Sequence, residues 1–141
     1  LAAYGANCGI GVSDLIGAVM AMRKCAGNDD ILIAKGNCGI PEFVGSEICY
    51  SGTPELMAEY ACLARDLNVR IIGGCCGTTP DHLRAMREAL ETRDLRPEPS
   101  LDHVVSLLGP VTAGTRMCCE EDFNTLLEQT QPHRERRRRS N

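Results

Sequence analysis

The sequence predicts an α/β fold of consecutive strand–loop–helix units with a parallel sheet. Three observations predict it: three short apolar runs typical of strands, a glycine-rich or polar loop after each, and a helical apolar pattern after each loop. Strands that alternate with helices at this spacing indicate parallel βαβ architecture. The chain has 141 residues, of which 43% are hydrophobic, enough for one ordinary domain with a core.

The first unit is a short strand over residues 1–8, followed by a helix that we expect Ser13 to cap. The residues of this helix that share one apolar face are Leu15, Ile16, Val19 and Met20. The second unit begins with a strand over residues 30–37, in which we expect residues 31–34 to be a continuous buried run. A long loop over residues 38–52 is expected to follow.

Thr53 and Pro54 have the residue types of a helix N-cap and first helical position. The expected apolar stripe of this second helix is Leu56, Tyr60, Ala64 and Leu67. The third unit has a strand over residues 69–72, a loop with two adjacent cysteines, and a helix that begins at Thr79 and Pro80. We expect this third helix to turn inward its residues Leu83, Met86 and Leu90.

The composition changes after residue 92, so we divide the chain into residues 1–92 and 93–141. The second part begins with a linker rich in proline and charge. We expect a short helix, capped by Ser100 and ended by Gly109 and Pro110, and then a poorly ordered extension with a short helix near residues 123–127. The arginine run in residues 134–139 is typical of a solvated tail.

Charge and cysteine content narrow the possible partners and the compartment. The net charge is −4, and the arginine-rich tail leaves the rest of the chain more acidic still, which argues against a nucleic-acid partner. Without a long apolar run or an export signal, we expect no membrane partner and a cytoplasmic location. Nine cysteines in a reducing compartment indicate metal binding or catalysis rather than disulfides.

Distinctive side chains follow each predicted strand. Cys8 follows the first, Asn37 the second, and Cys75 with Cys76 the third. In parallel α/β folds these loops lie on one face, where active sites form, so we expect the three thiols to converge. Three thiolates with a fourth position left open describe a zinc site of the catalytic kind.

The other cysteines allow alternatives. Cys38, beside Asn37, could close the site as a fourth thiolate and make the zinc structural. We interpret Cys25 and Cys62 as inert buried thiols, and Cys49 has no partner pattern. The pair at residues 118–119 has neither glycine flanks nor a preceding strand, so we expect no metal there.

The motifs "GANCGIG", "GIPEF" and "GGCCGTTPDHLRAM" resemble those of the homocysteine S-methyltransferase family. This family includes betaine–homocysteine methyltransferases and the homocysteine module of cobalamin-dependent methionine synthase. The resemblance covers residues 1 to about 92 and implies the C-terminal three βα units of a TIM (β/α)8 barrel, with a C-terminal extension. It therefore implies that the N-terminal barrel half lies outside this sequence. A three-stranded parallel sheet with uncovered apolar faces and a sequence that starts at Leu1 also suggest a fragment of a longer protein. A homo-oligomer is a further possible partner.

The resemblance implies that Cys8, Cys75 and Cys76 are the zinc ligands and that Asn37 is a ligand that substrate displaces. The implied function is transfer of a methyl group from a betaine-like or other small donor to the thiol of homocysteine, which gives methionine. We expect residues 1–141 to be inactive without the other barrel half. The alternatives are the homocysteine-binding module of a cobalamin-dependent methionine synthase and a non-catalytic structural zinc module.

Overall fold

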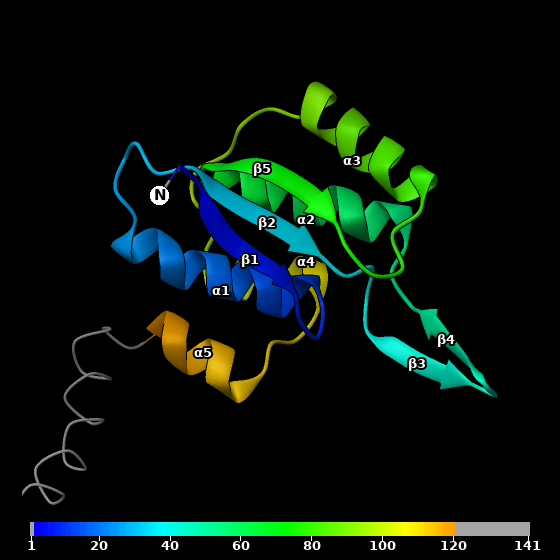
Figure 1. The fold of residues 1–141 in the computed structure, drawn as a ribbon. Helices are drawn as coiled ribbons and strands as arrows, with labels where there is room; N and C mark the ends of the chain where they lie inside the picture. Colours follow the sequence, from blue (N-terminus) through cyan, green and yellow to red (C-terminus); the bar gives the residue numbers. More distant parts are fainter. Residues whose placement is uncertain (1, 121–141) are drawn as a thin grey trace, which may run out of the picture.

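The computed structural model describes residues 2–120, and Figure 1 shows its ten helices and strands. In chain order they are β1 (Tyr4–Cys8), α1 (Val12–Cys25), β2 (Leu32–Gly36), β3 (Pro41–Val44), β4 (Glu47–Tyr50), α2 (Pro54–Asp66), β5 (Val69–Gly74), α3 (Pro80–Thr92), α4 (Leu101–Leu108) and α5 (Ala113–Glu120).

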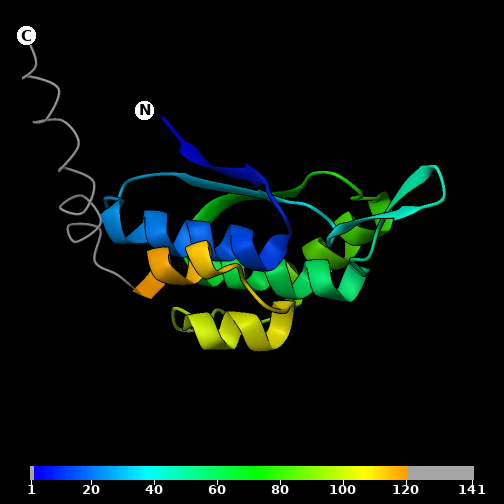
Figure 2. The ribbon, with the colours of Figure 1, turned by 90° about the horizontal axis from the view of Figure 1, so that it is seen from below.

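The main sheet contains three parallel strands in the order β1-β2-β5, so the predicted α/β class with parallel βα units is confirmed. Helices α1 and α2 pack on the same face of this sheet, and α3 packs beside α2 near β5 (Figures 1 and 2). Within residues 2–120 the sheet is open, with β1 and β5 as its edges. All three strands run in one direction, so their following loops lie together at one end of the sheet.

The core lies between the sheet and the helices. Its fully buried side chains include Tyr60, Ile16 and Leu32. The prediction that residues 31–34 form a continuous buried run is wrong, because burial alternates along β2 and Ile31 is 37% exposed. Burial alternates along β2 because, in the described part of the chain, helices cover only one of the two faces of the sheet. The prediction that Leu83 faces inward is also wrong. Leu83 is exposed because it lines an open apolar groove between α3 and β5.

The predicted helix starts are confirmed for three helices, which have Thr53, Thr79 and Ser100 as their N-caps, and the start predicted at Ser13 is wrong. The Thr53 hydroxyl accepts a hydrogen bond from the Leu56 amide, and the Ser100 hydroxyl accepts one from the His103 amide. Helix α1, however, begins at Val12, so Ser13 lies inside it and donates its hydroxyl to the Pro110 carbonyl. An extended backbone at Gly11 lets the helix start two residues earlier than the sequence suggests.

The loop expected over residues 38–52 contains a β-hairpin instead, formed by β3 and β4. Its two strands pair in antiparallel register, and Gly45 makes the turn with a positive φ of 67°. The hairpin projects from the carboxyl end of the main sheet (Figure 1). Phe43 is 79% exposed. The alternation that marks a half-buried strand is weak here because the hairpin has no buried face among the described residues.

The C-terminal region is more ordered than the sequence suggests, because α5 occupies part of the expected extension. Helix α4 packs on α1 and α2 and lies beyond the layer that these two helices form (Figure 2), whereas α5 packs alongside α1 (Figure 1). The helix expected near residues 123–127 and the arginine run lie outside the described residues. None of the helices within residues 2–120 is long and apolar enough to span a membrane.

One carboxylate fastens α5 to α1. Asp14 accepts hydrogen bonds from the Thr112 amide at 3.0 Å, the Thr112 hydroxyl at 2.8 Å and the Thr115 hydroxyl at 2.6 Å. Partial burial works against the ionised carboxylate, but the bonds from Thr115 and Thr112 outweigh it and lower the pKa of Asp14. Because the pKa is lowered in the folded state, the ionised Asp14 carboxylate stabilises this contact fully above the ordinary aspartate pKa. The stabilisation is lost as the pH falls from there through the lowered pKa.

We therefore expect Asp14→Ala to weaken the docking of α5 by about 1 kcal/mol, the scale of a partly exposed charged hydrogen bond. Amide hydrogen exchange of α5 should speed up severalfold at neutral pH. In the wild type the same protection should decline as the pH falls below about 4. Asp102→Ala is the matched control, since Asp102 is 90% exposed and 3.6 Å from Arg116. Equal exchange in the two variants would contradict this role for Asp14.

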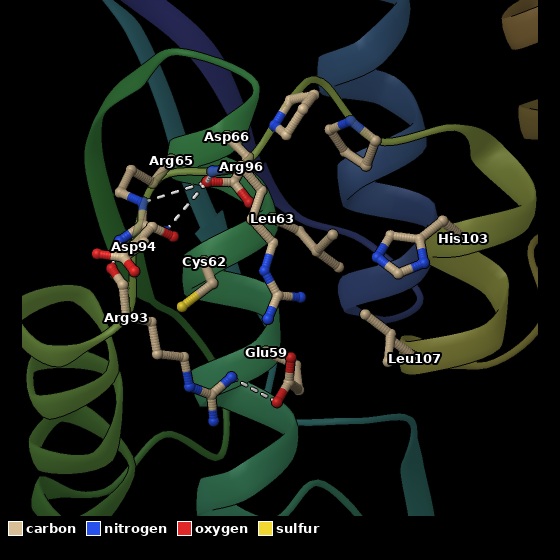
Figure 3. Close-up of a pocket in the computed structure, with 12 residues that line it drawn as sticks. Glu59, Cys62, Leu63, Arg65, Asp66, Arg93, Asp94, Arg96, His103 and Leu107 are labelled. Carbon is tan, nitrogen blue, oxygen red and sulfur yellow. Dashed lines mark hydrogen bonds and ion pairs between the residues drawn. The ribbon is translucent and has the colours of Figure 1, made fainter.

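The linker after α3 is held by charged groups that also line a small pocket (Figure 3). The Arg65 guanidinium donates to the carbonyl oxygens of Arg93 and Asp94, both at 2.7 Å, and to the Asp66 carboxylate at 3.1 Å. The Asp66 carboxylate also accepts the Arg96 amide, and Arg93 pairs with Glu59 on α2. These charged groups are paired within the protein, so the pocket marks the contact between helix α2 and the linker.

Candidate metal centre

Three thiols meet at the carboxyl end of the sheet. The sulfurs of Cys8 and Cys76 are 4.0 Å apart, those of Cys75 and Cys76 are 3.8 Å apart, and all three lie within 4.8 Å of one another. Two sulfurs bound to one tetrahedral zinc at about 2.3 Å lie roughly 3.8 Å apart. The three cysteines predicted from the sequence are therefore brought together at a spacing that a zinc ion fits.

The backbone turns sharply at both thiol-bearing loops. Strand β5 ends at Gly74, so Cys75 and Cys76 are both in the following turn and their side chains are free of the strand's alternation. Cys8 ends β1 with a positive φ of 69°, a conformation that non-glycine residues seldom adopt. Such backbone strain tends to collect at functional sites, and here it accompanies the approach of Cys8 to the other loop.

Two of the three thiols, those of Cys8 and Cys75, have pKa values shifted in opposite directions. A hydrogen bond with Asn37, and then one with Cys76, lowers the pKa of the Cys8 thiol. Burial, and then the hydrogen bond with Cys76, raises the pKa of Cys75. The lowered pKa of Cys8 and the raised pKa of Cys75 mean that Cys8 ionises more readily than Cys75. Burial and a hydrogen bond with Cys76 also raise the pKa of Tyr50, which places its phenol beside the thiols.

Asn37 lies directly after β2 and is 3% exposed. Its side-chain amide nitrogen donates to the Gly9 carbonyl at 2.6 Å, which keeps the amide beside the Cys8 loop. Its side-chain oxygen is buried without a hydrogen-bond partner. A buried carbonyl oxygen without a partner costs free energy, so this atom is available to a bound ligand.

Cys38 is not part of the thiol cluster. Its sulfur is 3.0 Å from His82 Nε2 and donates to the Gly52 carbonyl at 3.3 Å, in a site where only 1% of the residue is exposed. Burial raises the pKa of its thiol. This geometry does not favour the structural zinc site in which Cys38 provides a fourth thiolate.

The remaining cysteines lie away from the three thiols. Cys62 is buried as expected, whereas Cys25 is exposed because it ends α1, and Cys49 is exposed on the hairpin. Cys119 donates to the Gly17 carbonyl at 3.2 Å and so takes part in the contact between α5 and α1.

Sequence reasoning missed His82. It stands at the third position of α3, where its Nδ1 accepts a hydrogen bond from the Thr79 amide at 3.1 Å. The sequence signal was a histidine three residues after a threonine N-cap, in the place where glutamate or glutamine completes a capping box.

The sequence model of the homocysteine S-methyltransferase family matches residues 1–90. The chain belongs to this family. The match spans the three βα units as far as the last turn of α3, so it includes each of the loops that carry the thiols and Asn37. The resemblance drawn from the sequence motifs is confirmed.

Proposed function

We propose that this protein binds zinc through Cys8, Cys75 and Cys76 and transfers a methyl group from a small donor to the thiol of homocysteine, giving methionine. The observation that carries this proposal is the convergence of the three sulfurs from two loops in a chain of this family. Zinc bound by three thiolates supplies an open position at which a substrate thiol is held deprotonated.

The residues present fit such a metal in two further respects. The S···S separations of 3.8 and 4.0 Å require little movement to become those of a tetrahedral site. The orphaned side-chain oxygen of Asn37 is a neutral donor, suited to occupy a position that a substrate thiol takes over. We infer that Asn37 is this exchangeable ligand and that its amide favours the Cys8 thiolate through their hydrogen bond.

The fold supports the rest of the proposal. The open edges at β1 and β5, and the groove lined by Ile72, Leu83, Met86 and Leu90, offer surfaces for neighbouring strands and helices. We propose that the three βα units are the C-terminal part of a TIM barrel. The amino-acid end of homocysteine and the methyl donor would then bind largely to the other barrel half, and betaine, S-methylmethionine and methylcobalamin are the donors to compare.

Homocysteine binding should release a proton. A thiol with a pKa near 8.5 is almost fully protonated at pH 7, so holding it as a thiolate frees about one proton per molecule bound. We expect zinc-loaded protein with its complete domain to release about one proton per homocysteine. The release can be followed with a pH indicator in weakly buffered solution.

Methionine in place of homocysteine is the matched control, because its thioether has no proton to lose. Homocysteine that binds without proton release would contradict the proposed function. So would proton release that persists in Cys75→Ser. A structural zinc site closed by Cys38 would also give no proton release when homocysteine is added. In that case Cys38→Ser would lose its zinc.

A further inference from the structure

Two loops meet behind the thiol cluster through main-chain hydrogen bonds. The Cys75 amide donates to the Gly36 carbonyl at 2.7 Å, and the Cys38 amide donates to the Cys76 carbonyl at 2.9 Å. These bonds continue the β2–β5 ladder past the ends of both strands. Asn37 lies between the two bonded residues, so the position of its amide depends on how firmly Cys38 is held.

The side chain of Cys38 is held by His82. The Nε2 atom of His82 lies 3.0 Å from the Cys38 sulfur and 3.3 Å from the Gly52 carbonyl oxygen. His82 Nδ1 accepts from the Thr79 amide, so a neutral ring carries its proton on Nε2 and donates it toward Cys38 and Gly52. One ring therefore ties the start of α3 to the loops that follow β2 and the hairpin.

The location of His82 fits positioning rather than catalysis. The residue is 9% exposed, and both ring nitrogens already have partners in the protein. It does not belong to the group of side chains whose ligand atoms converge with the three sulfurs. An effect of His82 on the metal centre would therefore pass through Cys38 and its neighbour Asn37.

We propose that His82 is a positioning residue of the metal centre: its contact with Cys38 holds the Asn37 amide against the thiols and so slows zinc loss when no substrate is bound. The inference rests on the proposed function, because it assumes zinc at the three thiols. A bound homocysteine thiol takes the place of the Asn37 oxygen, so the contribution of His82 disappears when the substrate is present.

The test is the rate at which zinc-loaded protein loses its metal to EDTA, with and without saturating homocysteine. Without homocysteine, His82→Ala should lose zinc about fivefold faster than the wild type, the effect expected from one neutral hydrogen bond. With homocysteine the two rates should agree within about twofold, since the thiol replaces the Asn37 oxygen. A rate raised equally under both conditions would indicate general destabilisation and overturn the proposal.

Two conservative variants separate positioning from helix capping. The short side chain of His82→Asn can meet the Thr79 amide but cannot reach Cys38, so it should behave like His82→Ala. His82→Gln extends an amide N–H to about the position of Nε2 and should restore the wild-type rate. If His82→Ala fails to fold, the comparison of His82→Asn with His82→Gln still tests the proposal. Equal rates of zinc loss in these two variants would refute it.

A double-mutant cycle with Asn37 completes the experiment. In an Asn37→Ala background, His82→Ala should cause no further acceleration, because the group that it positions is gone. Rates that multiply instead would refute the inference while leaving the zinc site intact. Zinc that survives Cys8→Ser, or wild-type protein that holds no zinc, would refute the proposed function and the inference together.

Discussion

Cys8→Ser is expected to abolish stoichiometric zinc binding. The substitution leaves two thiolates, one fewer than the three protein ligands of a catalytic zinc site, and serine is a poor ligand while its hydroxyl is protonated. The loss of affinity should far exceed the roughly 10–100-fold that follows removal of an outer hydrogen-bond partner. Metal analysis of purified protein should give about one zinc for the wild type and nearly none for the variant.

The chain provides matched controls for this prediction. Cys118→Ser removes an exposed thiol, and Cys119→Ser removes one that bonds to Gly17 far from the cluster, so both variants should keep their zinc. Cys38→Ser should keep it as well, because the serine hydroxyl can accept from His82 and donate to Gly52. Zinc that persists in Cys8→Ser, or is lost in Cys38→Ser, would show that the ligand set is different.

The helical units were predictable because local signals and burial agree in them. Thr53 caps α2 as its residue type suggests, and the Tyr60–Ala64–Leu67 stripe is buried against the sheet. The hairpin was missed because its apolar side chains, such as Phe43, point to solvent and so follow no burial pattern. Helix α5 was missed because its position depends on contacts with Asp14, about a hundred residues earlier in the chain.

The thiol cluster could be predicted for a general reason: residues that directly follow parallel strands must come together at one end of the sheet. The supporting contacts do not follow from this rule. His82 meets Cys38 because α3 starts close to the loop after β2, and that distance depends on the length and turn of the intervening segments. The sequence shows which groups can ligate, whereas the buried polar contacts behind them depend on the packed structure.

Gly77→Ala is expected to weaken both the fold and the metal centre. Gly77 follows the two cysteines with a φ of +73°, and an alanine there would cost about 1–2 kcal/mol in backbone conformation alone. An added Cβ would also overlap the Tyr50 ring, which packs against the core. Either the ring or the loop must move. The phenol lies beside Cys76, so a shift of either disturbs the thiols.

We therefore expect Gly77→Ala to lower the melting temperature and to accelerate zinc loss to EDTA by about tenfold or more, corresponding to at least about 1.4 kcal/mol. Gly45→Ala is the matched control. Gly45 has a similar φ of 67° but no atom within 4 Å of an added Cβ, and it lies in the hairpin turn. Gly45→Ala should lower stability through its backbone conformation and leave zinc retention unchanged.

Tyr50→Ala in the Gly77→Ala background should recover part of the zinc retention by removing the overlap. If Gly77→Ala and Gly45→Ala prove alike in both measurements, Tyr50 does not buttress the cysteine loop, and the rigidity of that loop must come from its main-chain bonds to Gly36 and Cys38 alone.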